Sequence, residues 1–272
     1  MAGKVYLVGA GPGDPELLTR KAWRVLQAAS VVLHDDLVPQ EILSVLPPTA
    51  QIVNVGKRCG DKKISQAEIG ALMVQLAREG KIVARLKSGD PLLFGRAGEE
   101  MEVLRAANIV FEVIPGVTAA LGAAASAQIS LTDRRHASRV VFVTAHREGG
   151  IGLGNERHVA ADTTYVIYMP GNRYGELGAE LQAAGIGAEI PCAVISRATT
   201  KDEMILRTTV GQLPECPPAA SPSLIVVGIV AGAPAHEENA LDHEFSRNVN
   251  EEILQLAVQH PSHHPYGRGS VE

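Results

Sequence analysis

Short β-branched and apolar runs alternate with helical apolar periodicity along the first half of the chain. Strands are predicted at residues 5–8, 30–34, 51–55, 81–86 and 109–114, and helices at 16–29, 65–79 and 99–107. Ser65 and Glu68 form a capping-box pattern at the start of the second of these helices. Strand–helix alternation at this spacing is typical of βαβ units. We therefore expect an α/β fold with a mainly parallel sheet.

The second half of the chain repeats this style in less regular form. Strands are predicted at 139–144, 164–169, 192–196 and 224–230, a helix at 174–184 and an antiparallel segment at 204–209. At 272 residues the chain exceeds the typical domain size of about 100–150 residues. We predict an N-terminal α/β domain at 1–115, a C-terminal α/β domain at 116–235 and a tail at 236–272, with at most one short helix near 251–258.

Composition and charge exclude several classes of protein. A net charge of −5 argues against a general nucleic-acid binder. Cys59, Cys192 and Cys216 are far apart and form no CxxC pair, which suits a reducing compartment. The N-terminus shows no signal-peptide pattern, and the uncharged stretch 113–132 is rich in Ala, Gly, Ser and Thr. We expect a tight loop and a closely packed helix there, no membrane span, and a cytoplasmic protein.

A glycine-rich loop, Val8-Gly-Ala-Gly-Pro-Gly-Asp-Pro15, joins the first predicted strand to the first helix. Glycines let a ligand approach the backbone, and a dinucleotide site would also need an acid about 20 residues later. Asp35 and Asp36 supply that acid, but the glycine spacing is not G-x-G-x-x-G. Pro12 and Pro15 also remove two backbone donors. Alone, the loop fits a nucleotide-type site and a structural turn equally well.

Two more turns follow predicted strands of the same sheet. Arg85-Leu-Lys-Ser-Gly-Asp-Pro-Leu-Leu-Phe-Gly-Arg96 stands at a carboxyl strand end, where open α/β sheets bind ligands. Asp90 in this turn either accepts hydrogen bonds from a ligand or caps the turn. In Pro115-Gly-Val-Thr-Ala-Ala120, Thr118 is either a helix N-cap or a ligand contact. The three turns together favour a ligand site.

Taken in order and spacing, these motifs resemble the tetrapyrrole methylases, and within them the branch that methylates uroporphyrinogen III. The matching segments are 8–14, 34–38, 56–58, 85–91, 94–100, 115–120, 131–134, 168–169 and 224–228. The resemblance spans about residues 4–233. It implies two α/β domains with the cofactor cleft between them, and a homodimer.

The activity that this resemblance implies is the transfer of two methyl groups from S-adenosylmethionine to carbons 2 and 7 of uroporphyrinogen III. The products are precorrin-2, which feeds siroheme and cobalamin biosynthesis, and S-adenosylhomocysteine. The implied cofactor contacts are Pro12, Ser88, Gly89, Asp90, Leu93, Thr118, Ala119, Met169 and Ala198.

The resemblance also implies roles near the substrate. Asp35 and Lys57 occupy the positions of a proton acceptor and a proton donor. The positions expected near the tetrapyrrole are Arg96, Glu99, Arg134 and Met169. Arg96 is a second candidate for the catalytic base, although arginine, with a pKa above about 12, is better suited to binding carboxylates. The chain departs from the family pattern at Ser88, where glycine is usual, and at Asp36, where arginine is common.

Two other functions remain open at this point. One is a later corrin-pathway methylase acting on a precorrin, against which Lys57, the run at 89–96 and the segment 131–134 argue. The other is a non-catalytic nucleotide-sensing or NAD-binding module, in which Asp35 would hold a ribose. His260, His263 and His264 could bind a metal but are more typical of a solvated tail, so no metal is predicted.

Overall fold

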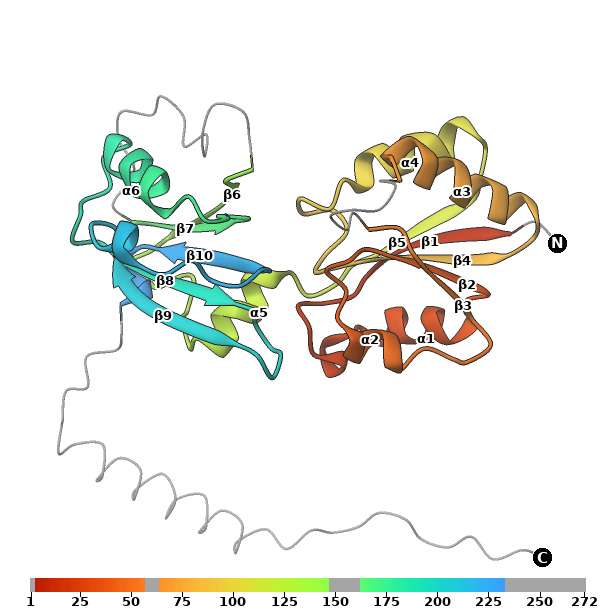
Figure 1. Ribbon diagram of the computed structural model, residues 1–272, viewed down its shortest axis with the longest axis horizontal. Helices are drawn as coiled ribbons and strands as arrows, with labels where there is room; N and C mark the ends of the chain where they lie inside the picture. Colours follow the sequence, from red (N-terminus) through yellow and green to blue (C-terminus); the bar gives the residue numbers. More distant parts are fainter. Residues whose placement is uncertain (1–2, 57–63, 147–161, 233–272) are drawn as a thin grey trace, which may run out of the picture. The chain divides into compact units, whose positions relative to one another are not determined.

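The computed structural model describes residues 3–56, 64–146 and 162–232. The first of its two sheets has five parallel strands in the order β3-β2-β4-β1-β5 (Figure 1). Their bounds are β1 (Lys4–Gly9), β2 (Val31–His34), β3 (Gln51–Asn54), β4 (Ile82–Lys87) and β5 (Phe111–Ile114). The predicted parallel sheet is confirmed.

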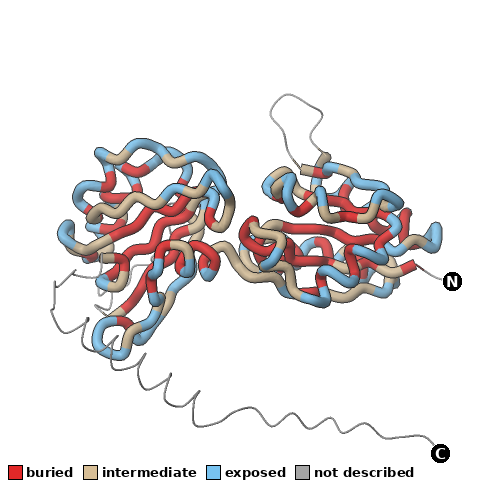
Figure 2. Tube along the Cα trace, turned by 90° about the horizontal axis from the view of Figure 1, so that it is seen from below, coloured by how far each residue is buried: buried red, intermediate tan, exposed pale blue. Residues whose placement is uncertain are grey.

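Helices cover both faces of this sheet. On one face lie α3 (Gln66–Arg78) and α4 (Ala97–Ala106), and on the other α1 (Arg20–Ala28) and α2 (Gln40–Ser44) (Figure 1). Successive strand residues point to opposite faces, so Val5 and Leu7 pack toward α3 and α4, whereas Val8 packs toward α1. Burial on both faces explains the nearly continuous apolar strand sequences (Figure 2).

The second sheet is mixed, with the order β6-β7-β10-β8-β9. Its strands are β6 (Arg139–Thr144), β7 (Thr163–Tyr168), β8 (Pro191–Ser196), β9 (Met204–Thr209) and β10 (Ser223–Val227). Only β6 and β7 pair in parallel; β10 is antiparallel to β7 and β8, and β9 to β8, as predicted for the segment at 204–209. Helices α5 (Ala119–Ser126) and α6 (Tyr174–Ala183) pack on opposite faces.

Several element bounds differ from the prediction. The helix expected from residue 16 begins at Arg20, and Pro15–Leu17 instead form the 3-10 helix η1. Two successive caps cause this, because Asp14 accepts from the amide of Glu16 and Thr19 from that of Ala22. Helix α2 and two further 3-10 helices, η2 (Leu213–Glu215) and η3 (Ile229–Ala231), were not predicted.

The two sheets use separate stretches of one unit, residues 1–232, which is distinct from residues 233–272. The domain boundaries proposed at 115/116 and 235/236 stay predictions, and the helix near 251–258 and the tail histidines lie outside the described residues. The stretch 113–132 contains a loop and the eight-residue α5, as expected. Across the described ranges, no helix has the length and apolar character needed to cross a membrane.

Candidate functional site

The three turns singled out in the sequence meet at the carboxyl ends of β1, β4 and β5. Gly11 and Gly89 exchange backbone hydrogen bonds of 3.2 and 2.8 Å. A Cβ atom on Gly9 would lie 2.5 Å from the amide nitrogen of Gly116, and one on Gly116 would lie 2.3 Å from the carbonyl oxygen of Gly89. The backbones are therefore in direct contact, and only glycine fits where they cross.

Asp90 joins the second turn to the third. Its Oδ1 accepts from the amide of Leu92 at 2.8 Å, and its Oδ2 accepts from that of Gly116 at 3.0 Å. Of the two roles open from the sequence, the structure shows the capping one. Because each oxygen still has a free lone pair, the same carboxylate can also accept from a ligand.

A cavity of about 500 Å³ lies beside these turns, a volume within the usual range for small-molecule sites. Every residue predicted to contact the cofactor lines it, together with Asp35 and Arg96. The cofactor set is Pro12, Ser88, Gly89, Asp90, Leu93, Thr118, Ala119, Met169 and Ala198. The structure thus brings together residues from both sheets' loops that are up to 186 positions apart.

An aromatic pair forms part of the cavity wall. The rings of Phe94 and Tyr168 lie 5.0 Å apart between centroids, and both residues line the cavity. The Tyr168 hydroxyl is 2.6 Å from Oγ1 of Thr118 and accepts from the amide of Ala120 at 3.1 Å. Burial raises the pKa of Tyr168. Thr118 stands at the N-cap of α5 without a capping bond, so Tyr168 satisfies an amide that a cap would normally take.

Left-handed backbone conformations gather at the same place. Phe94, Arg96 and Met169 line the cavity with φ angles of 54°, 55° and 54°, and Arg197 and Thr199, which flank Ala198, have φ of 47° and 65°. Such angles are uncommon for residues other than glycine and concentrate at functional sites. No feature of the sequence predicts them.

A network of charged side chains lies between the cavity and α4, on one face of the first sheet. Strand alternation places Arg85 and Lys87 on the same face as Val83, where Glu100 of α4 meets them. Arg85 Nη2 lies 2.5 Å from Asp35 Oδ1, and Arg85 Nε lies 2.9 Å from Glu100 Oε1. Arg85, Lys87 and Glu100 are 1–3% exposed, whereas the Asp35 side chain is 31% exposed.

Of the remaining predicted site residues, only Arg96 lines the cavity within the described part of the chain. Arg96 donates to both carboxylate oxygens of Glu99, at 2.8 and 2.7 Å, and this pairing raises the pKa of Arg96. Glu99 and Arg134 are not among the residues that line the cavity, and Arg134 is exposed. Lys57 lies outside the described residues, but Gly56 before it lines the cavity.

Asp36, the departure from the family pattern, is hydrogen-bonded to the end of β3. Its Oδ1 accepts from Nδ2 of Asn54 at 2.8 Å, and Asn54 in turn accepts from the amide of Gly56 at 2.8 Å. Asp36 therefore helps to hold the end of β3 beside the cavity, which it also lines.

Sequence reasoning missed several residues of the site, chiefly Gln66, Arg85, Lys87, Phe94 and Tyr168. Arg85 and Lys87 did carry a signal, because two charged residues on one face of an otherwise apolar strand demand buried partners. The partner itself, Glu100, depends on how α4 packs on the sheet. Such packing is not readable from local sequence.

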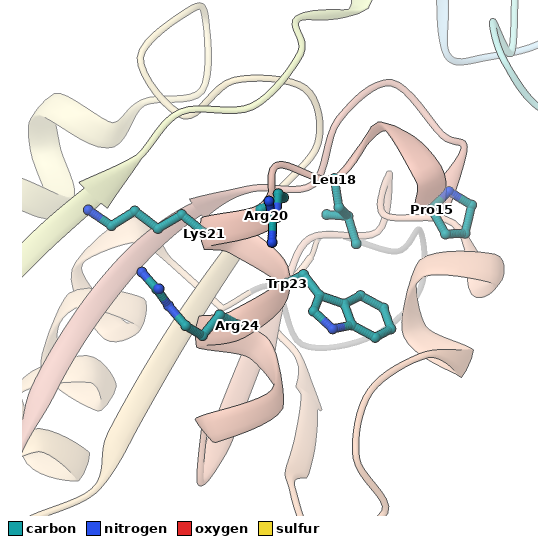
Figure 3. Close-up of a pocket in the computed structure, with 6 residues that line it drawn as sticks. All are labelled: Pro15, Leu18, Arg20, Lys21, Trp23 and Arg24. Carbon is teal, nitrogen blue, oxygen red and sulfur yellow. The ribbon is translucent and has the colours of Figure 1, made fainter. Parts of the chain in front are cut away.

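A second hollow, of about 590 Å³, lies on α1 and is lined by Pro15, Leu18, Arg20, Lys21, Trp23 and Arg24. Figure 3 shows Lys21 and Arg24 extending to one side of the helix and the Trp23 ring to the other. Lys21 is paired with Glu112, and the lining contains no carboxylate, thiol or imidazole. The cavity at the three turns, which has acidic and basic groups, is the better candidate.

Neither cysteine in the described ranges is disulfide-bonded. Cys192 is buried and Cys216 partly buried, both as free thiols, while Cys59 lies outside those ranges. Burial raises the pKa of the Cys192 thiol to about 12. Within the same ranges, no group of three His, Cys, Asp or Glu side chains could hold a metal ion. The absence of a metal stays a prediction.

Comparison with known proteins gives a consistent result. A family model described as tetrapyrrole (corrin/porphyrin) methylases matches residues 4–214. Siroheme synthase 1 of Serratia proteamaculans (strain 568) is 46% identical over 230 residues, which cover 84% of this chain and 48% of that protein. Siroheme synthase of Nitrosococcus oceani is 44% identical over 230 residues, with 83% and 49% covered. The chain spans about half the length of these curated relatives.

Solved structures show the same fold. A uroporphyrin-III C-methyltransferase from Thermus thermophilus matches with a TM-score of 0.73 and 42% identity, over 85% of this chain and 95% of that one. One complexed with S-adenosylhomocysteine matches with a TM-score of 0.75 and 36% identity, over 87% and 96%. A cobalt precorrin-4 methyltransferase matches with a TM-score of 0.74 and 30% identity, over 85% and 96%.

Proposed function

Because the chain belongs to the tetrapyrrole (corrin/porphyrin) methylases, we propose that it methylates uroporphyrinogen III at carbons 2 and 7 to give precorrin-2. The methyl donor is S-adenosylmethionine, and the product feeds siroheme and cobalamin biosynthesis. The observation that carries this proposal is the single cavity that unites the cofactor set with Asp35 and Arg96. The proposed homodimer follows the family resemblance, and the proposed cytoplasmic location follows the unpaired spacing of the cysteines in the sequence.

The cavity wall fits an amphipathic cofactor. Gly89 has φ of +66°, and a Cβ there would lie 3.5 Å from the amide nitrogen of Ala119 and 3.8 Å from Cα of Thr118, which is ordinary van der Waals contact. Ser88, Ala119 and Ala198 are small, while Leu93 and Met169 are apolar. The cofactor, when bound, supplies a methyl group already activated on a sulfonium. The protein therefore has to align the substrate and exclude water rather than provide a strong nucleophile.

In this proposal Asp35 accepts the proton that leaves the tetrapyrrole. Its carboxylate lines the cavity and is oriented from behind by Arg85 and Lys87. A base must reach the proton that it removes, which a partly exposed carboxylate can do. The rival base, Arg96, is paired with Glu99, and the raised pKa of Arg96 makes loss of its proton still less favourable. Lys57 is proposed as the proton donor from the family resemblance.

Substrate binding in this account uses arginine forks. Uroporphyrinogen III carries eight carboxylate side chains, and guanidinium groups bind carboxylates in a bidentate manner. Arg96 lines the cavity with its fork now on Glu99, so a substrate carboxylate would replace or share that partner. We propose Arg134 as a second contact from the rim, and Met169 as an apolar contact to the macrocycle.

The proposal is tested by incubating the protein with uroporphyrinogen III and methyl-labelled S-adenosylmethionine. Two labels per tetrapyrrole, with precorrin-2 as the product, are expected. Labelling of a precorrin but not of uroporphyrinogen III would assign the chain to a later methylase. A cobalt precorrin-4 methyltransferase is among the similar solved structures. Calorimetric binding of NAD without binding of S-adenosylhomocysteine would instead support a nucleotide-binding module.

A further inference from the structure

Glu100 is a carboxylate buried beneath the cavity, 1% exposed. Its Oε1 accepts three hydrogen bonds, from Arg85 Nε at 2.9 Å, Lys87 Nζ at 3.0 Å and Gln66 Nε2 at 2.9 Å. Its Oε2 is buried and has no hydrogen-bond partner within the described part of the chain. This single oxygen of α4 therefore binds side chains from two other elements, β4 and α3.

The same two cations reach from Glu100 to Asp35. Arg85 bridges the two carboxylates, with Nε on Glu100 and Nη2 on Asp35 at 2.5 Å. Its Nη1 also donates to the carbonyl oxygens of Leu33 and Leu86, at 3.4 and 3.3 Å. The Lys87 ammonium is 3.0 Å from Glu100 and 3.7 Å from Asp35. Asp35 therefore cannot move without disturbing groups that Glu100 fixes.

Burying this network of charges in the core costs free energy of folding. Buried charges lose their hydration, and apolar residues of similar volume often give equal or greater stability. The two cations and two carboxylates balance in charge, and the most exposed member of the four is Asp35, which lines the cavity. Such a network beside a cavity is more readily explained by a role in function than by stability.

We propose that Glu100 is a positioning residue for methyl transfer, which fixes Asp35 in the cavity through Arg85 and Lys87. This inference rests on the proposed function, because it assumes that Asp35 accepts the substrate proton. Glu100 itself lies behind the network and does not line the cavity.

The charges around Asp35 determine in which direction the pH profile should shift when Glu100 is neutralised. Arg85 and Lys87 face Asp35 from β4, with Glu100 behind them on α4, while the neighbouring Asp36 carboxylate is bonded to Asn54 of β3. His34 is also close, with its Nδ1 3.0 Å from the backbone carbonyl oxygen of Asp35, and Lys57 lies outside the described residues. Neutralising Glu100 would leave Arg85 and Lys87 without their second carboxylate, so that both cations would act on Asp35 alone.

The test compares Glu100→Gln with Glu102→Gln, the same substitution at an exposed position of the same helix. In Glu100→Gln we expect kcat to fall by about tenfold or more and the acid limb of kcat/KM to shift to lower pH. The affinity for S-adenosylhomocysteine should match that of the wild type. Glu102→Gln should behave as the wild type in all three measurements.

A folded Glu100→Gln variant with wild-type kcat and an unshifted acid limb would overturn the proposal. So would equal losses of cofactor affinity and kcat without a pH shift, since that pattern marks a merely structural role. If Glu100→Gln does not fold, Arg85→Lys serves instead, because lysine keeps the charge but lacks the fork that spans both carboxylates. Its kcat should fall by about tenfold with the acid limb unmoved, and a wild-type kcat would overturn the proposal.

Failure of the proposed function gives a different result. The wild type and Glu102→Gln would then transfer no methyl group to uroporphyrinogen III, and the same variants would be compared on the precorrin that the wild type does methylate. A pH shift and a slower kcat in Glu100→Gln on that substrate would still support the positioning role, and their absence would overturn it.

Discussion

The acidic residues of the site differ in what their oxygens hold. Asp90 uses both on backbone amides, which keeps the second and third turns together. Asp35 pairs with buried cations, and Glu99 pairs with an arginine that is half exposed. Removing each carboxylate should therefore damage a different property: the turn itself, proton transfer, or the availability of Arg96.

Gly89 provides the sharpest test of the cofactor wall. Gly89→Val should abolish binding of S-adenosylhomocysteine, because the new side chain would enter the cavity. The φ of +66° adds about 1–2 kcal/mol of backbone strain, which the fold should tolerate. Calorimetry measures the binding and circular dichroism the folding. Unchanged affinity in a folded variant would place the cofactor elsewhere.

Arg96 and Arg134 test the substrate contacts. Arg96→Leu and Arg134→Leu should each raise the KM for uroporphyrinogen III by about tenfold, or ~1.4 kcal/mol, and leave cofactor affinity unchanged. Arg24→Leu on α1, which removes the same charge away from the cavity, is the matched control. If both arginine variants turn over uroporphyrinogen III like the wild type, the carboxylate-binding assignment is wrong.

At the scale of elements, the sequence predicts what local chemistry determines. The capping box at Ser65, the parallel first sheet and the helix after the third turn are all confirmed. The five-residue α2 was missed because it is short and Pro39 at its N-cap makes no side-chain bond. Apolar periodicity does not encode strand direction, so the antiparallel pairing of β10 could not be predicted.

The candidate site divides in the same way. The family resemblance implied the cofactor set, and all of its members line one cavity, while their role in cofactor binding stays a prediction. The Glu100 network depends on α4 packing over β4, and the bond from Tyr168 to Thr118 depends on contact between β7 and the start of α5. These contacts join residues distant in sequence and became visible only in the structure.

Ser65 tests how much a local cap contributes to stability. Its Oγ accepts from the amide of Glu68 at 3.2 Å, and Glu68 Oε2 accepts from the amide of Ser65 at 2.6 Å. Ser65→Ala should lower the free energy of unfolding by about 0.5–2 kcal/mol, whereas Ser65→Asp, which keeps an acceptor, should stay near the wild type. Urea denaturation measures both. Equal stability of the alanine and aspartate variants would contradict the capping account.

For the molecule as a whole, Glu112 links three elements of the first sheet layer. Its carboxylate in β5 pairs with Lys4 of β1, at 2.7 Å, and with Lys21 of α1. The hydrogen bonds from Lys21 and then Lys4 lower the pKa of Glu112 from 4.5 to about 2. The ionised form is therefore favoured in the folded protein, and this contribution to stability is present above pH 4.5.

The contribution of Glu112 should be lost as the pH falls from about 4.5 to about 2, because the unfolded chain takes up the proton first. Urea denaturation should show wild type more stable than Glu112→Gln at pH 6, by a small amount because the pair is partly exposed. The difference should shrink through this window. A difference that stays constant down to pH 2 would show that the ion pairs are not its source.

The central claim is that one cavity holds both the cofactor and Asp35, and that Asp35 serves in proton transfer but not in cofactor binding. The most direct test is the single-turnover rate of methyl transfer to uroporphyrinogen III by Asp35→Asn at saturating S-adenosylmethionine, with the affinity for S-adenosylhomocysteine confirmed beforehand. The account predicts a rate lower by about 100-fold or more, since an interaction of the transition state is lost, with cofactor affinity unchanged. A wild-type rate, or a large loss of cofactor affinity in place of a loss of rate, would contradict it.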